Sequence, residues 1–240
     1  MKREDVFYNI KLSIDFYFRE VFCKKYGLYE TKTKKIQSVI KNKKYQLDGE
    51  VLLTDGNGNA ELNIYIKSGN EVVENFVFDC VNNTLCFTES MQNVEIEYNV
   101  LAVDIVDAYP EDKSDDFEKQ MIAISTDDIY SRPFDVVGSV HRWYLPFYID
   151  MFLFSRVLRN RISNASAIMF KSISIPIIDF NNNGIINKDG TFNKEFSFDK
   201  NAISYIDKFG NIKIESNDLE SLDKKKMYSC TVSGEISVNF

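Results

Sequence analysis

The chain has 240 residues, of which 44% are hydrophobic and 14% aromatic, and its formal net charge is −7. This composition supplies enough apolar side chains for a packed core and excludes general disorder. The acidic total argues against general nucleic-acid binding, which needs basic surface to neutralise phosphates. Nucleic acid is expected as a partner only if a local basic patch lines a channel.

Residues 4–25 are predicted to form a helix, because apolar side chains recur at intervals of three and four residues. Ile10, Ile14 and Phe18 belong to this stripe, and Gly27 is placed to end the helix in a left-handed conformation. The lysine-rich residues 31–44 that follow are interpreted as a solvated loop or a short helix.

Several β-strands are predicted next. Residues 45–54 and 61–67 flank the turn sequence Asp-Gly-Asn-Gly-Asn and are expected to form a hairpin. Residues 74–80 and 84–88 suggest a second hairpin, and alternation continues through 94–106. Further strands are expected at 121–125, 139–154 and 174–180.

Residues 156–171 are predicted to form a second helix with Ser155 as its N-cap. Its apolar face is expected to comprise Leu158, Ile162, Ala165 and Met169, with Arg156, Arg159 and Asn160 facing outward. Beyond residue 181, short alternating segments at 212–215, 228–232 and 236–240 suggest more strands. They could complete the main sheet or form a partly independent module.

These elements predict an α+β fold in which two helices pack on a mainly antiparallel sheet. We expect an α+β core domain over residues 1–180 and a β-rich C-terminal extension over 181–240. The N-terminus lacks an apolar run and a cleavage site, so no signal peptide is expected, and no stretch is long enough to span a membrane. We therefore expect no membrane partner.

The sequence contains no motif for a nucleophilic triad, a phosphate-binding loop or a zinc site, so we expect neither an enzyme nor a cofactor. Its single histidine, His141, is interpreted as a surface or packing residue. The four cysteines are expected to be free thiols, although Cys80 and Cys86 could approach each other at a hairpin tip. Asp179, Asn181 and Asn183 match the opening of a calcium loop, but Gly190 replaces the bidentate Glu. An asparagine-rich turn is the preferred interpretation, and a non-enzymatic, calcium-dependent binding module is the alternative function.

Five of the seven arginines lie between residues 129 and 180, beside many aromatic residues. Arginine and aromatic side chains are enriched in the cores of protein interfaces. The alternative is that the arginines are solvated charges that balance an acidic protein. We predict an interface that includes Arg132, Arg142, Trp143, Tyr144, Arg156, Arg159 and Arg161.

Residues 129–180 resemble the neck and tail-completion proteins of tailed bacteriophages, of the tail-terminator or connector type. The similarity lies in PFDVVG at 133–138, FYIDMF at 147–152, the helix containing residues 159–163, and IPIIDF at 175–180. In that family a loop similar to PFELGG precedes a strand of the FxIDIF kind and a helix. Here Asp135, Val136 and Val137 replace the usual Glu-Leu-Gly, and the helix lacks an acidic pair.

The resemblance implies a structural virion component that forms a homo-oligomeric ring at the neck or tail end. Neighbouring tail and neck proteins would be its partners, and assembly would take place in the bacterial cytoplasm. Phage-tail-like particles such as tailocins fit the same pattern. A ring follows when a head-to-tail interface closes by rotation.

Overall fold

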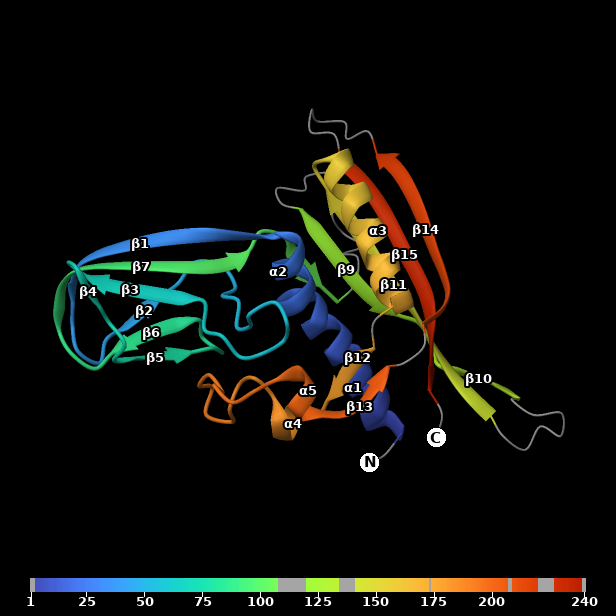
Figure 1. The fold of residues 1–240 in the computed structure, drawn as a ribbon, viewed down its shortest axis with the longest axis horizontal. Coiled ribbons are helices and arrows are strands. Elements are labelled where there is room, and N and C mark those ends of the chain that lie inside the picture. Colours follow the sequence, from blue (N-terminus) through green and yellow to red (C-terminus); the bar gives the residue numbers. More distant parts are fainter. Residues whose placement is uncertain are drawn as a thin grey trace. The chain divides into compact units, whose positions relative to one another are not determined.

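The computed structural model describes residues 3–107, 120–133, 141–172, 174–206, 209–219 and 227–238. The fold is α+β, with mostly antiparallel sheets (Figure 1). The chain forms two compact units, each discontinuous in sequence. Unit 1 comprises residues 1–15, 103–177 and 203–240, and unit 2 comprises residues 16–102 and 178–202. The boundary predicted after residue 180 does not coincide with this division, because the last strands belong to the same unit as residues 103–177.

Unit 1 is built around one sheet with the strand order β14-β15-β11-β9-β8. The strands are β8 (Asp104–Val106), β9 (Met121–Thr126), β11 (His141–Leu153), β14 (Phe209–Leu219) and β15 (Met227–Val238). A further strand, β10 (Tyr130–Pro133), pairs with the start of β11. The predicted strands at 121–125 and 139–154 are confirmed, and the C-terminal segments complete the main sheet instead of forming a separate module.

Helix α3 (Arg156–Ser172) packs on one face of this sheet (Figure 1). Side chains in the middle of β11 point alternately into the core, so Phe147, Ile149 and Met151 are buried. The ring of Phe147 lies 4.8 Å from that of Phe170 on α3. Gly234 of β15 lies opposite Phe147 in the register. A Cβ atom at Gly234 would come within 2.8 Å of the Phe147 ring, so only glycine allows this close approach.

The predicted N-terminal helix is confirmed, but it is not a uniform α-helix. It consists of α1 (Arg3–Phe16), a π-helical segment η1 (Tyr17–Phe22) and α2 (Cys23–Tyr26). Gly27 ends it with φ of 73°, as expected for a left-handed C-terminal residue. Ile10, Ile14 and Phe18 are all buried, as the apolar stripe predicted.

Unit 2 contains two antiparallel sheets. The first has the order β1-β7-β3-β4, with β1 (Tyr29–Val39), β7 (Met91–Leu101), β3 (Ile64–Ser68) and β4 (Glu71–Val72). The second has the order β2-β6-β5, with β2 (Lys44–Gln46), β6 (Thr84–Phe87) and β5 (Phe76–Asp79). The hairpin predicted for 74–88 is therefore confirmed as β5 and β6.

The hairpin predicted between residues 45–54 and 61–67 is wrong. The turn itself forms, because the Asp55 carboxylate accepts hydrogen bonds from the backbone N–H groups of Asn57 and Asn59. However, β2 and β3 lie in different sheets, and β3 pairs with β4 and β7. The intervening chain contributes only isolated bridges, such as Thr54 with Ala60.

The interpretation of residues 31–44 as a loop or short helix is also wrong, because most of this stretch belongs to β1. The strand pairs with β7 over its length, so that Lys35 lies opposite Glu95 and their side chains form an ion pair at 3.2 Å. The lysines lie on a strand with little burial, and pairing with acidic β7 compensates for their weak β-propensity.

The remaining elements connect the two units along the chain. Strand β12 (Ile175–Ile178) pairs with β13 (Ala202–Ile206), which confirms the strand predicted at 174–180. Between them lie two single helical turns, α4 (Phe180–Asn183) and α5 (Phe198–Asn201). The rings of Phe180 and Phe198 both pack against Phe16.

Candidate functional site

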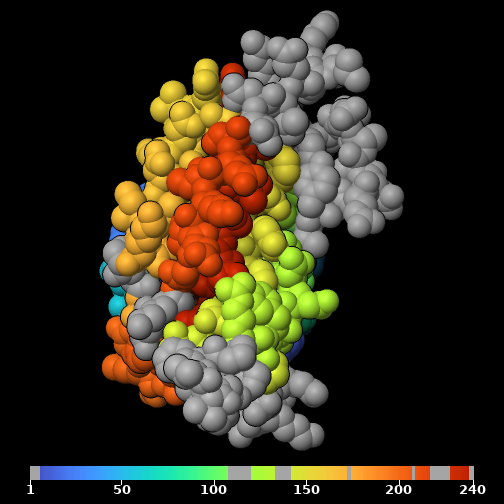
Figure 2. Space-filling view, turned by 90° about the vertical axis from the view of Figure 1, so that its right-hand side faces the viewer, coloured from blue at the N-terminus to red at the C-terminus, as the bar shows by residue number. Residues whose placement is uncertain are grey.

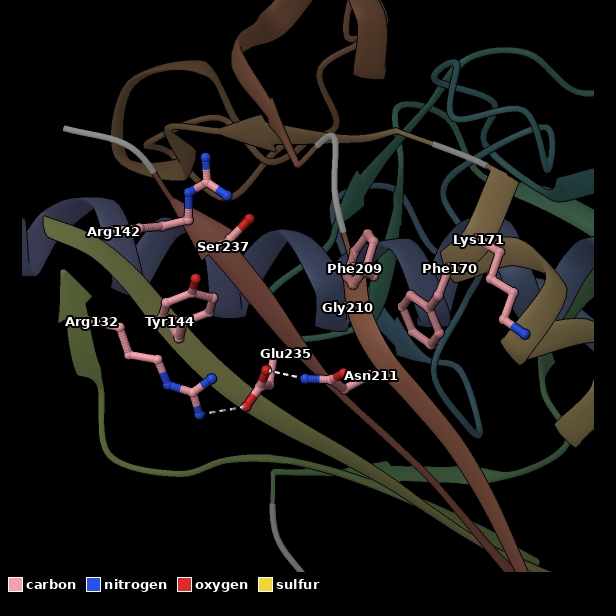
Figure 3. A pocket seen from close by; sticks show the side chains of 10 residues that line it. All are labelled: Arg132, Arg142, Tyr144, Phe170, Lys171, Phe209, Gly210, Asn211, Glu235 and Ser237. Carbon is pink, nitrogen blue, oxygen red and sulfur yellow. Dashed lines mark hydrogen bonds and ion pairs between the residues drawn. The ribbon is translucent and has the colours of Figure 1, made fainter. Parts of the chain in front are cut away.

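A cavity of about 420 Å³ lies in unit 1 and is lined from five elements of the unit (Figure 3). Its lining combines three cationic side chains, one carboxylate and three aromatic rings. The lining residues are Arg132, Arg142, Tyr144, Phe170, Lys171, Phe209, Gly210, Asn211, Glu235 and Ser237. Strands β10 and β14, from which Arg132 and Asn211 come, lie on the face shown in Figure 2.

The pairing of β10 with β11 brings two tyrosines and an arginine together. Tyr130 lies opposite Tyr144 in the register, and their rings stack with centroids 5.4 Å apart. The guanidinium of Arg132 lies 4.9 Å from the Tyr130 centroid and 5.3 Å from that of Tyr144. Both distances are within the range of a cation–π interaction.

Glu235 of β15 completes this group by accepting hydrogen bonds from two sides. The Tyr130 hydroxyl donates to one carboxylate oxygen, and Asn211 Nδ2 donates to the other at 2.6 Å. Arg132 Nη2 lies 3.9 Å from the same carboxylate. The hydrogen bond to Glu235 raises the pKa of Tyr130 above its ordinary value. We call these five residues, Tyr130, Arg132, Tyr144, Asn211 and Glu235, the arginine–tyrosine cluster.

Asn211 reaches Glu235 because β14 has an irregularity at this point. The register with β15 shifts between Gly210 and Lys213, and Asn211 has φ of 54°. Asparagine tolerates this left-handed conformation better than most residues. The bulge therefore interrupts the regular pairing of β14 with β15 and brings the Asn211 amide within hydrogen-bond distance of the Glu235 carboxylate.

The structure brings three of the predicted interface residues, Arg132, Arg142 and Tyr144, together at this cavity. Trp143 is half-buried on β11 and is not among the residues that line it. Arg156 and Arg161 are exposed on α3. These last three residues are therefore not gathered with the cluster.

The prediction that Arg159 faces outward is wrong. The residue is only 3% exposed, and its guanidinium donates to the Ser229 carbonyl at 3.3 Å and to Asn160 Oδ1 at 2.9 Å. It also lies 5.7 Å from the centroid of the Tyr228 ring. Arg159 therefore joins α3 to β15, and it is not available to another subunit.

No protein-family model matches the chain, and neither a curated protein nor a solved structure matches it. None of the helices in the described part of the chain has the length and apolar character needed to cross a membrane.

The residues singled out as a weak calcium loop form a helical turn. The backbone N–H groups of Asn182 and Asn183 donate to the Asp179 carbonyl, and Asn182 Nδ2 donates to the Asp179 carboxylate at 2.8 Å. Asn181 and Asn183 are exposed on this turn. Over the described residues, no three His, Cys, Asp or Glu side chains are grouped so that they could hold a metal ion. This geometry favours the asparagine-rich turn.

Other sequence expectations have mixed outcomes. None of the four cysteines forms a disulfide; Cys23 and Cys230 are buried, and Cys80 and Cys86 are half-buried. The loop at residues 134–138, which carries part of the family resemblance, lies outside the described residues. So does the acidic segment at 111–116. The backbone of His141 lies in β11, opposite Pro133 of β10.

A second cavity of about 420 Å³ lies in unit 2, and the carboxyl group of Glu20 forms part of its lining. Glu20 is 5% exposed, and its Oε2 accepts a hydrogen bond of 2.7 Å from the Leu53 backbone N–H. Burial raises the pKa of Glu20 from its ordinary value of 4.5 to about 8, with the nearby Glu50 adding to the effect. Neither hydrophobic periodicity nor a known motif distinguishes Glu20 in the sequence, because it lies next to an apolar position of the predicted helix.

The raised pKa of Glu20 predicts a loss of stability with rising pH. Because the folded protein holds this proton more tightly than the unfolded chain, the stabilisation is fully present below about pH 4.5. It is lost as the pH rises through about 8. We expect the melting temperature of the wild type to fall more steeply over this interval than that of Glu20→Gln, which cannot ionise. Parallel melting curves for the two proteins across that interval would contradict the assignment.

Proposed function

We propose that the chain is a structural subunit that assembles into a homo-oligomeric ring at the neck or tail end of a phage or a phage-tail-like particle. The observation that carries the proposal is the arginine–tyrosine cluster, which presents cationic and aromatic groups at the surface of a sheet. The resemblance of residues 129–180 to tail-completion proteins supports the same class.

The cluster has the physical properties of an interface anchor. The Arg132 side chain is 59% exposed, although two rings and the Glu235 carboxylate hold its position. A side chain that is already ordered loses less conformational entropy when a partner binds. Arginine and tyrosine are also among the residues that contribute most binding energy at interfaces.

An acidic surface on a neighbouring subunit would complement this cluster. Asp127 and Asp128 are exposed at the end of β9, and the Asp127 carboxylate accepts a hydrogen bond from Tyr148 at 3.0 Å. Contact between the arginine–tyrosine cluster of one copy and these aspartates of the next would be head-to-tail. Such an interface closes into a ring when the rotation that relates neighbouring copies is a whole-number fraction of a full turn.

The test is a charge reversal at Arg132. We expect wild-type protein to form rings or defined multimers by mass photometry and negative-stain imaging. Arg132→Glu should remain monomeric, because it places a carboxylate opposite an acidic surface. Lys188→Glu, an equal change at an exposed residue of unit 2, is the control and should assemble normally.

Circular dichroism of Arg132→Glu should match the wild type, and its melting temperature should fall only slightly, because the lost contacts with Tyr130, Tyr144 and Glu235 involve a largely exposed side chain. If Arg132→Glu still forms oligomeric rings, the arginine–tyrosine cluster is not part of the subunit interface. A wild-type chain that stays monomeric at high micromolar concentration would contradict self-assembly into a ring.

A further inference from the structure

The cavity of unit 2 is lined by both apolar and polar residues, and it contains one buried carboxyl group, that of Glu20, which forms no ion pair with a described cation. Its apolar side chains come from three stretches of the unit, at 47–53, 78–81 and 186. These side chains are Leu47, Val51, Leu53, Phe78, Val81 and Ile186. Pockets of this size and character bind small molecules that carry one or two polar groups.

Glu20 reaches the cavity from the π-helical segment η1. A π-helical turn is rare, and such turns occur frequently at functional sites. The surrounding backbone is fixed to this turn, because Thr54 Oγ1 donates to the Glu20 carbonyl at 2.9 Å and Leu53 donates to its carboxyl group. The position of the carboxyl group is therefore well determined.

The nearby charged groups are engaged with other partners. Arg19 Nη1 contacts both oxygens of Glu50, at 2.9 and 2.7 Å. Lys24 Nζ donates to the Thr54 carbonyl at 2.7 Å and to Asn63 Oδ1. The Cys80 thiol, also in the lining, has its pKa raised to about 12 by burial and by Asp79, so it stays neutral. Among the described residues, no cation lies within ion-pair distance of Glu20.

We propose that this cavity binds an alkylammonium group, with the ammonium paired to Glu20 and the alkyl chain against the apolar walls. An ammonium donates up to three hydrogen bonds, and a charge-assisted bond to a carboxylate is stronger than a neutral one. The cavity thus supplies both parts that a short alkylamine or a lysine side chain requires.

Binding is coupled to the release of a proton. In the free protein at neutral pH the Glu20 carboxyl is mostly protonated, because burial disfavours its charged form. When the ammonium ion enters already charged, the carboxyl releases its proton to bulk water and the ion pair forms. Glu50, Lys24, Arg19 and Cys80 are the other titratable groups around the cavity, and Glu50 is paired with Arg19.

Isothermal titration calorimetry with n-butylammonium tests the proposal. At pH 7 we expect the measured enthalpy to differ between phosphate and Tris buffers by the amount that corresponds to release of nearly one proton. n-Butanol, which has the same alkyl chain without the charge, should bind at least about tenfold more weakly. Equal binding of the amine and the alcohol, or no binding of the amine, would overturn the proposal.

A matched pair of variants isolates the carboxyl group. Glu20→Gln keeps the size and the acceptor for Leu53, and it should weaken n-butylammonium binding at least about tenfold. Glu95→Gln, which removes an exposed carboxylate on β7, should bind as the wild type does. Unchanged binding by Glu20→Gln would overturn the proposal, and if that variant does not fold, the proton count of the wild type decides.

A further titration distinguishes the two sources of an alkylammonium group. The ligand is Nα-acetyl-lysine methylamide, in which both backbone ends of lysine are blocked. Binding of both this ligand and n-butylammonium with proton release assigns the site to a lysine side chain of a partner protein. Binding of n-butylammonium alone assigns it to a free amine.

Discussion

Arg159→Glu should unfold unit 1 or lower its free energy of unfolding by about 3–5 kcal/mol. The substitution removes the donor to the Ser229 carbonyl and places a carboxylate in a site that is 3% exposed. A buried carboxylate beside a carbonyl oxygen lacks a donor and suffers like-sign electrostatic repulsion. The loss would be measured by urea denaturation followed by circular dichroism.

Arg156→Glu is the matched control on the same helix, because Arg156 is exposed. It should change the free energy of unfolding by less than about 1 kcal/mol. Equal stability of the two variants would show that the guanidinium of Arg159 is not part of the packed interior.

Ile14→Asp is expected to destabilise the protein by about 4 kcal/mol or more, because Ile14 is 1% exposed on the apolar face of α1. The change both removes a packed side chain and buries a group that must either stay charged without a partner or be protonated at a cost. Thermal melting and urea denaturation measure the effect.

Tyr8→Asp provides the comparison, since Tyr8 lies on the same helix and is 57% exposed. Its effect should stay within about 1 kcal/mol. Wild-type-like melting of Ile14→Asp would show that this face of α1 is not buried within the subunit.

Local periodicity predicted the elements whose signal lies within the element itself. Strand β11 and the hairpin of β5 and β6 are apolar or regularly alternating, and they form as expected. Strand β1 was missed because its stability comes from β7, which lies far along the chain and supplies Glu95 opposite Lys35. Sequence composition alone assigns such a lysine-rich segment to solvent.

Helix α3 shows how a correctly predicted helix can bury a wider face than its apolar side chains indicate. The prediction followed the apolar side chains of Leu158, Ile162 and Met169. The structure also buries a second row of side chains, spaced three or four residues apart, of which three are polar. These are Arg159, Ser163, Ser166 and Phe170. Ser166 satisfies its hydroxyl within the helix by donating to the Ile162 carbonyl at 2.8 Å, so burial costs it little.

The arginine–tyrosine cluster was predictable only in part. Arg132 and Tyr144 stood out because arginines and aromatic residues are concentrated in one segment. Glu235 and Asn211 could not be identified, because their positions depend on the register of β15 against β11 and on the bulge in β14. Both features are set by pairing between strands that are distant in sequence.

The place of β15 between β11 and β14 also affects the order in which the protein can fold during synthesis. Strand β11 meets β9 and β10 along one edge early, but its other edge has no partner until residues 227–238 have been made. Before that point the backbone groups along this edge of β11 are unpaired and open to water and to other nascent chains. A domain closed by such a long-range pairing folds slowly and is prone to aggregate while incomplete. Chaperone dependence during translation is therefore the physiological consequence we expect of this strand order.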